Sequence, residues 1–94
     1  MFASVRRYEG VTDPGEAARR VADGLVPLLN EIDGFVAYHF VDAGDGVMCS
    51  TSVFEDQSGS DASNERAAGW VRENLAELVP NPPMITEGEI VASA

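Results

Sequence analysis

The sequence predicts one α+β domain spanning residues 1–94, with the ferredoxin-like order strand, helix, strand, strand, helix, strand. The chain has 94 residues, 45% of them hydrophobic, which is enough for one core and too few for two. Two segments show helical periodicity, and four segments rich in β-branched or aromatic residues surround them. Right-handed crossovers then place both helices on one face of a four-stranded antiparallel sheet.

The first strand and the first helix have clear local signals. Residues 2–9 mix aromatic and β-branched residues with polar ones, which is typical of a strand. Asp13-Pro14-Gly15-Glu16 then supplies a capping acid, a proline at the first helical position and a Glu at the third. The apolar face of this helix is predicted to contain Ala18, Val21, Ala22, Leu25, Leu28, Leu29 and Ile32. Pro27 lies on the polar side, where it predicts a kink, and Gly34 marks the end.

The next two strands form a predicted hairpin. Residues 35–41 and 47–54 are rich in aromatic and β-branched side chains. The segment between them, Asp42-Ala43-Gly44-Asp45-Gly46, is rich in residues that tolerate positive φ. The two strands are therefore expected to pair in an antiparallel manner.

A second helix and a last strand complete the predicted order. Residues 57–61 are polar and predict a loop. After this loop, a helical stripe ending near Val79 is predicted to contain Asn64, Ala68, Val71, Leu75 and Leu78. The prolines within residues 80–83 cannot continue a helix, so residues 84–92 are predicted to form the fourth strand.

The sheet face without helices predicts a homodimer. The second strand is apolar or aromatic at both alternating sets of positions: Phe35, Ala37 and Val41, and Val36, Tyr38 and Phe40. Two helices cover only one face, so the other would expose a large apolar patch. A second copy of the chain is the simplest cover.

The composition excludes several classes of partner and reaction. Six Arg and no Lys stand against sixteen Asp and Glu, a net charge of −10, so nucleic acid and membrane surfaces are not expected partners. The absence of Lys also excludes Schiff-base lysine chemistry and a P-loop. A single Cys cannot form an intrachain disulfide, and no segment has the apolar length of a signal peptide or membrane span. We therefore expect a cytoplasmic protein.

The element order, the chain length and a Trp within the second helix, in Ala67-Ala68-Gly69-Trp70-Val71, resemble the antibiotic biosynthesis monooxygenase-like family. The resemblance implies a dimeric α/β barrel. Members include cofactor-free oxygenases of quinol-like aromatics, haem-degrading enzymes and proteins without known activity. Pro80 stands where haem-degrading members carry an axial His, so haem is not expected. Arg66 stands one turn before Trp70, where the oxygenases often carry an Asn, and no Arg follows Arg72.

Three residues are candidates for a catalytic site, each with a structural alternative. His39 is the only histidine, the residue type whose ordinary pKa suits a general base near neutrality, but a lone His on a strand is more often a core or interface residue. Trp70 could cap a pocket and donate its N–H to a developing oxyanion, or simply pack in the core. Asn64 could bind a ligand carbonyl, or cap the helix. Of Arg6 and Arg7, one must point toward the helices, where it could anchor an anion or form an ion pair.

No metal or other cofactor is expected. His39 and Cys49 are the only side chains with N or S donors typical of a zinc site, and two are too few to hold the ion.

Two functional hypotheses remain open. One hypothesis is a cofactor-independent monooxygenase acting on a small quinol-like or phenolic aromatic. The other is a non-catalytic homodimeric module of the same fold, which binds a small ligand or has a structural role.

Overall fold

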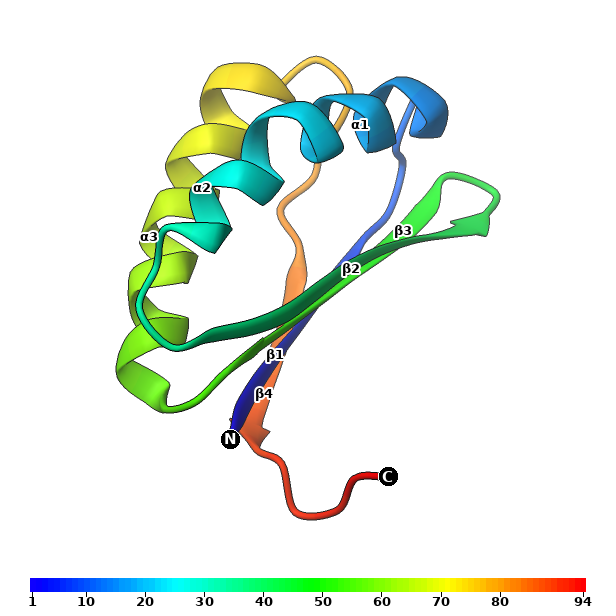
Figure 1. Ribbon diagram of the computed structural model, residues 1–94. Coiled ribbons are helices and arrows are strands. Elements are labelled where there is room, and N and C mark those ends of the chain that lie inside the picture. The colour runs from blue at the N-terminus through cyan, green and yellow to red at the C-terminus, as the bar shows by residue number, and fades with distance from the viewer.

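The four strands form one antiparallel sheet in the order β2-β3-β1-β4 in a computed structural model that describes all of residues 1–94. The strands are β1 (Phe2–Tyr8), β2 (Phe35–Gly44), β3 (Val47–Phe54) and β4 (Met84–Glu89). All helices lie on one face of this twisted sheet, and both termini lie near the end where β1 starts and β4 finishes (Figure 1). The predicted ferredoxin-like fold is therefore confirmed.

The first helical segment is divided into α1 (Pro14–Arg20), the π-helical turn η1 (Val21–Leu25) and α2 (Val26–Asn30). Its start is as predicted, because the Asp13 side chain accepts a hydrogen bond from the Glu16 backbone N–H at 3.2 Å. Pro27 has no N–H, and in an α-helix its ring would crowd the carbonyl four residues earlier. The wider turn relieves this crowding, with the Val26 N–H bonded to the Val21 carbonyl.

The hairpin between β2 and β3 closes more tightly than predicted. Asp45 and Gly46 have φ values of 54° and 77°, as a two-residue turn of type I′ requires. Strand β2 consequently extends to Gly44, three residues beyond the predicted end. Near the other end of β2, a register shift between Phe35 and Ala37 places an extra residue opposite β3.

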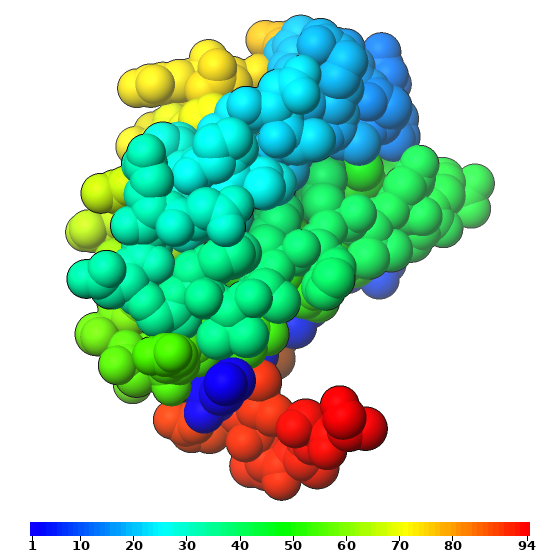
Figure 2. Space-filling model, viewed as in Figure 1, coloured from blue at the N-terminus to red at the C-terminus, as the bar shows by residue number.

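The second long helix, α3 (Gln57–Asn74), corrects the prediction at both ends. Residues 57–61 are helical and not a loop, because Asp56 caps the helix by accepting a hydrogen bond from the Gly59 N–H at 3.1 Å. The helix stops at Asn74, and a turn over residues 75–78 replaces its predicted last turn. Strand β4 ends at Glu89, and the residues after it extend away from the body of the domain (Figure 2).

The core fills the space between the helices and the sheet. Its largest fully buried apolar side chains are Phe54, Leu29 and Met48. The first helical segment buries Ala17, Val21, Leu25, Leu29 and Ile32. Ala17 therefore replaces the predicted Ala18, and Ala22 is exposed as well. Helix α3 likewise turns Ala67 inward and leaves Ala68 exposed, whereas Val71, Leu75 and Leu78 contribute to the core as predicted.

The opposite face of the sheet has no cover from the chain itself. The cross-strand pairs place these residues there: Ala3, Val5, Arg7, Ala37, His39, Val41, Cys49, Thr51 and Val53. Val5 and Val41 are 40% and 48% exposed, although their side chains are apolar. We call this set the outer face. None of the helices combines the length with the apolar composition needed to cross a membrane.

An ion-pair network ties α1 to the turn that follows α3. The Glu16 carboxylate accepts hydrogen bonds from Arg19 at 2.6 Å and from Arg20 at 2.8 Å, and Arg20 also pairs with Glu77. The hydrogen bonds from Arg19, and next those from Arg20, lower the pKa of Glu16 to about 2. Arg20 thus links α1 to the turn after α3, and the ionised Glu16 carboxylate holds the Arg20 guanidinium from its other side.

Candidate functional site

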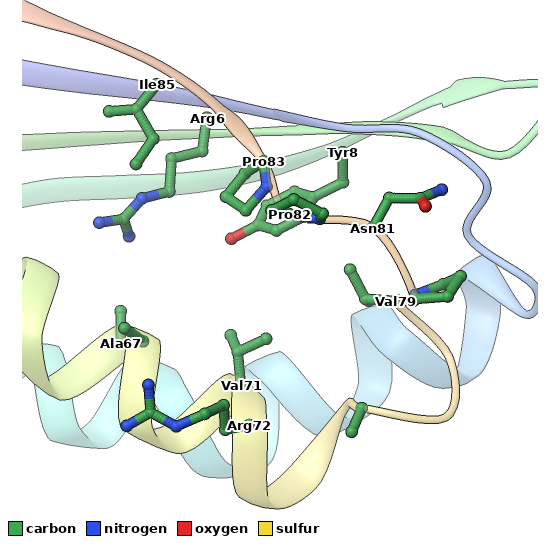
Figure 3. A pocket seen from close by; sticks show the side chains of 13 residues that line it. Arg6, Tyr8, Ala67, Val71, Arg72, Val79, Asn81, Pro82, Pro83 and Ile85 are labelled. Atoms are coloured by element: carbon green, nitrogen blue, oxygen red, sulfur yellow. The ribbon is translucent and has the colours of Figure 1, made fainter.

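A cavity of about 450 Å³ lies between α3, strands β1 and β4, and the connection that follows α3. Figure 3 shows the sheet on one side of this space and α3 on the other. The lining is more apolar than polar, and its residues are Arg6, Tyr8, Ala67, Ala68, Val71, Arg72, Ala76, Val79, Pro80, Asn81, Pro82, Pro83 and Ile85. A space of this size and character suits a small organic ligand.

The local sequence explains why this space stays open. Helix α3 offers short side chains at Ala67 and Ala68, so little volume extends from it toward the sheet. The three prolines at positions 80, 82 and 83 keep the returning chain out of a helical path, and it passes along one side of the cavity (Figure 3). The Asn81 side chain fastens this connection by donating to the Glu9 carbonyl at 3.1 Å.

Arg6 is the charged group that β1 presents to the cavity. Its guanidinium points from the sheet into the space (Figure 3) and donates a hydrogen bond to Asn64 Oδ1 at 2.5 Å. The Asn64 amide nitrogen in turn donates to Glu87 Oε2 at 3.1 Å. Arg6 forms no ion pair with a carboxylate in the protomer. Its positive charge is therefore free to interact with a ligand.

Tyr8 is the second polar group that β1 places on this wall. Its hydroxyl points into the cavity (Figure 3). Burial raises the pKa of Tyr8, and the nearby Arg6 charge opposes that shift in part. The neighbouring Tyr38, on β2, has its pKa raised to about 12, mainly by burial. Both phenols therefore stay protonated at neutral pH, so Tyr8 can act as a hydrogen-bond donor to a ligand.

The polar groups of the cavity suit an anion or a carbonyl oxygen better than a cation. They are two guanidinium groups, a phenol and the amide of Asn81. Elsewhere in the structure, no three or more His, Cys, Asp or Glu side chains are grouped so that they could hold a metal ion.

The structure does not bring the three predicted site residues together. Asn64 lies beside the cavity through its contact with Arg6. Trp70 does not line the cavity but packs against Gly24 of η1, where an added Cβ would lie 2.7 Å from the indole Cζ2. His39 is exposed on the outer face, opposite Thr51 of β3, so the sheet separates it from the cavity of its own protomer.

Sequence reasoning left the direction of Arg6 open and did not consider Tyr8. The alternation of β1 carries the missing signal, since Phe2, Ser4 and Tyr8 are buried and Arg6 shares their parity. The contribution of residues 79–83 could not be found in this way, because it depends on the path that the connection takes.

The sequence matches no protein-family model, and no curated protein is similar enough to it to count as a match. Solved structures do match over nearly the whole chain. A protein of unknown function from Nitrosomonas europaea, NE2512, is 26% identical, with a TM-score of 0.78 over 99% of this chain and 91% of that one. This match shows the shared fold but assigns no activity, because NE2512 is itself a protein of unknown function.

Two further structures with this fold are oxygenases. The monooxygenase from the gene ActVA-Orf6 of Streptomyces coelicolor, in complex with nanaomycin D, is 19% identical, with a TM-score of 0.72 over 98% of this chain and 92% of that one. SnoaB, a cofactor-independent oxygenase from Streptomyces nogalater, is 12% identical, with a TM-score of 0.76 over 98% and 94%. The predicted resemblance to antibiotic biosynthesis monooxygenases is thus confirmed in the fold. A protein of 14% identity from an uncultured marine organism is a dimeric ferredoxin-like protein.

Proposed function

We propose that this chain binds a small phenolic or quinol-like aromatic in the cavity beneath α3 and oxygenates it with dioxygen, without a redox cofactor. The observation that carries the proposal is Arg6, a half-buried guanidinium without a carboxylate partner that points into a mainly apolar cavity. Such a group stabilises a phenolate while the apolar walls hold the ring. The activities of ActVA-Orf6 and SnoaB, which share the fold, support this choice of reaction.

The reaction needs only the ligand and dioxygen. Ionisation of the phenol places electron density on a ring carbon, which forms a bond to one oxygen atom of O₂. Loss of water from the resulting hydroperoxide breaks the O–O bond and leaves a ring carbonyl. One oxygen atom enters the product, the other leaves as water, and the substrate supplies the four electrons. Arg6 and the Tyr8 hydroxyl would stabilise the negative charge on the substrate oxygen.

Proton removal takes place without a side chain in the cavity lining that could act as general base. The lining contains no His, Asp, Glu or Cys, and His39 lies across the sheet. We therefore propose that the phenol loses its proton to solvent, and that Arg6 favours this step by lowering the pKa of the bound ligand. Asn64 acts as a positioning residue, because it holds the guanidinium. Trp70 supports the fold through its contact with η1.

The same proposal includes a homodimer formed through the outer face. Val5 and Val41 expose much of their apolar surface there, and no other part of the chain covers them. A second copy would bury this face, and the dimeric ferredoxin-like protein of the same fold supports the arrangement. In such a dimer His39 would lie at the interface, which is the alternative that sequence reasoning left open for it.

Oxygen uptake tests the proposed reaction. Purified protein treated with a chelator should consume dioxygen in the presence of members of a phenol and quinol panel, with no added flavin, haem or metal. Arg6→Gln should lower the rate by roughly 10²-fold, because one donor to the developing charge is lost. Arg66→Gln is the matched control, since Arg66 pairs with Glu31 away from the cavity. Absence of uptake by wild type above the uncatalysed rate across the panel would overturn the proposal.

A non-catalytic ligand-binding module is the second candidate. The cavity lining contains no His, Asp, Glu or Cys that could act as general base, which favours this candidate. This candidate predicts saturable binding of the same phenols, sensitive to Arg6→Gln, with no oxygen uptake.

A further inference from the structure

The arginines that lack a carboxylate partner are both at the cavity. Four of the six arginines pair with Asp or Glu: Arg7 with Glu9, Arg19 and Arg20 with Glu16, and Arg66 with Glu31. The other two, Arg6 and Arg72, form no ion pair, and both line the cavity. In a chain with sixteen acidic residues, this leaves two positive groups at one cavity that no carboxylate of the protein pairs with.

The two arginines line the cavity from opposite walls. Arg6 extends from β1, and Arg72 extends from α3 (Figure 3). Arg6 is half-buried and held by Asn64, whereas Arg72 is exposed. Arg72 folds back along its helix over Gly69, where an added Cβ would lie 4.0 Å from the Arg72 Nη2 atom. One positive group is therefore inside the cavity and the other is closer to solvent.

From this arrangement we propose that the natural ligand carries a carboxylate in addition to its phenolic group, so that it is a hydroxyaryl carboxylate. Arg6 binds the phenolic oxygen, and Arg72 binds the carboxylate at the solvent side. A guanidinium forms paired, charge-assisted hydrogen bonds with a carboxylate, and no lining residue carries a negative charge that would compete.

Because the protein has a strongly negative net charge, binding of an anionic ligand requires the two arginines at the cavity. At −10 per chain, the whole molecule repels an anionic ligand, so a site for such a ligand needs positive charge close at hand. The phenolic group of this ligand rests on the proposed function, but the inference concerns ligand binding alone. It can therefore be tested without turnover.

The test compares ligands that differ only by the carboxylate. Binding of 1-naphthol, 5-hydroxy-1-naphthoate and 1-hydroxy-2-naphthoate is measured by calorimetry under anaerobic conditions at neutral pH. We expect at least one carboxylate to bind wild type about tenfold or more tightly than 1-naphthol, as one charge-assisted pair would provide. Arg72→Gln should abolish this difference and change 1-naphthol affinity less than twofold. Arg66→Gln, on the same helix, should preserve it.

Salt adds an independent readout. The preference for the carboxylate should shrink when the ionic strength rises from 0.05 to 0.5 M, while 1-naphthol binding changes little. Equal affinity of wild type for all three ligands, or a preference that survives in Arg72→Gln, would overturn the inference. Oxygen uptake measured in parallel separates the two proposals. A carboxylate preference without uptake supports the inference and rejects oxygenation, whereas uptake without the preference does the reverse.

Discussion

The side-chain oxygen of Asn64 accepts a hydrogen bond from the Arg6 guanidinium at 2.5 Å, joining α3 to β1 across 58 positions of the sequence. The Asn64 nitrogen meanwhile binds Glu87 of β4. Asn64 therefore lies between the Arg6 guanidinium and the Glu87 carboxylate and is hydrogen-bonded to both. The neutral amide of Asn64 orients Arg6 and leaves its positive charge unpaired. A carboxylate at the same position would neutralise that charge.

Asn64→Asp should weaken binding of phenolates without unfolding the protein. The new carboxylate would form an ion pair with Arg6 and compete with the ligand. We expect the KM for an active phenol to rise about tenfold, and the ionisation of the bound phenol to move to higher pH. Oxygen uptake measured from pH 6 to pH 10 checks both effects. A pH profile identical to that of wild type would show that Asn64 has only a structural role.

Gly24→Ala should destabilise the protein through Trp70. The added Cβ would lie 2.7 Å from the indole Cζ2, so the ring or η1 must move. Overpacking of this kind typically costs about 1–3 kcal/mol, which exceeds the gain of ~1 kcal/mol from replacing a helical glycine. Thermal unfolding should show a lower Tm. The matched control is Gly69→Ala in α3, where the nearest atom is 4.0 Å away and the Tm should rise. Equal shifts in the two variants would contradict the contact between Gly24 and Trp70.

Stability should fall in acid partly because Glu16 becomes protonated. Its pKa is about 2 in the folded protein and about 4.5 when unperturbed, so the unfolded state binds the proton more readily. The contribution of Glu16 is therefore complete above pH 4.5 and is lost as the pH falls toward 2. Urea unfolding of wild type and Glu16→Gln should differ at pH 6 and converge near pH 2. A difference that stays constant over this range would rule out the ionised network as its source.

Val5→Glu should produce a monomer. Val5 lies on the outer face, between Thr51 of β3 and Thr86 of β4, and a charge there would remain unpaired when two sheets meet. Sedimentation equilibrium at micromolar concentration should return twice the chain mass for wild type and a single chain mass for the variant. Ala62→Glu adds the same charge on the exposed side of α3 and should remain dimeric. A wild-type monomer would refute the proposed interface.

Local signals predicted most of the fold because caps and turns depend on neighbouring residues. Asp13 caps its helix and Gly34 ends the segment with a φ of 83°. The start of α3 was missed because its small residues resemble a loop. An added Cβ at Gly59 would lie 3.0 Å from Phe54 Cδ1, so the helix approaches the sheet too closely for a side chain there. Only the packed structure reveals that requirement.

The site was harder to predict, since it depends on which way strand residues point. The register shift near Phe35 changes the parity of β2, so Phe35 and Tyr38 both pack against the core and His39 faces outward. No local pattern marks this shift. Asn64 was found because an amide among apolar residues needs a partner, but its partner, Arg6, lies 58 positions away.

Mapping a bound phenol by NMR is the most direct test of where the ligand lies. Labelled protein would be titrated with 1-naphthol without oxygen, and chemical shifts would be followed at the cavity and at the outer face. We expect saturable shifts in the Arg6 side chain, the Ala67 methyl group and Ile85, which line the cavity, and little change at Val41 or His39. Shifts confined to Val41, His39 and their neighbours would place the ligand on the outer face and rule out the cavity as its binding site.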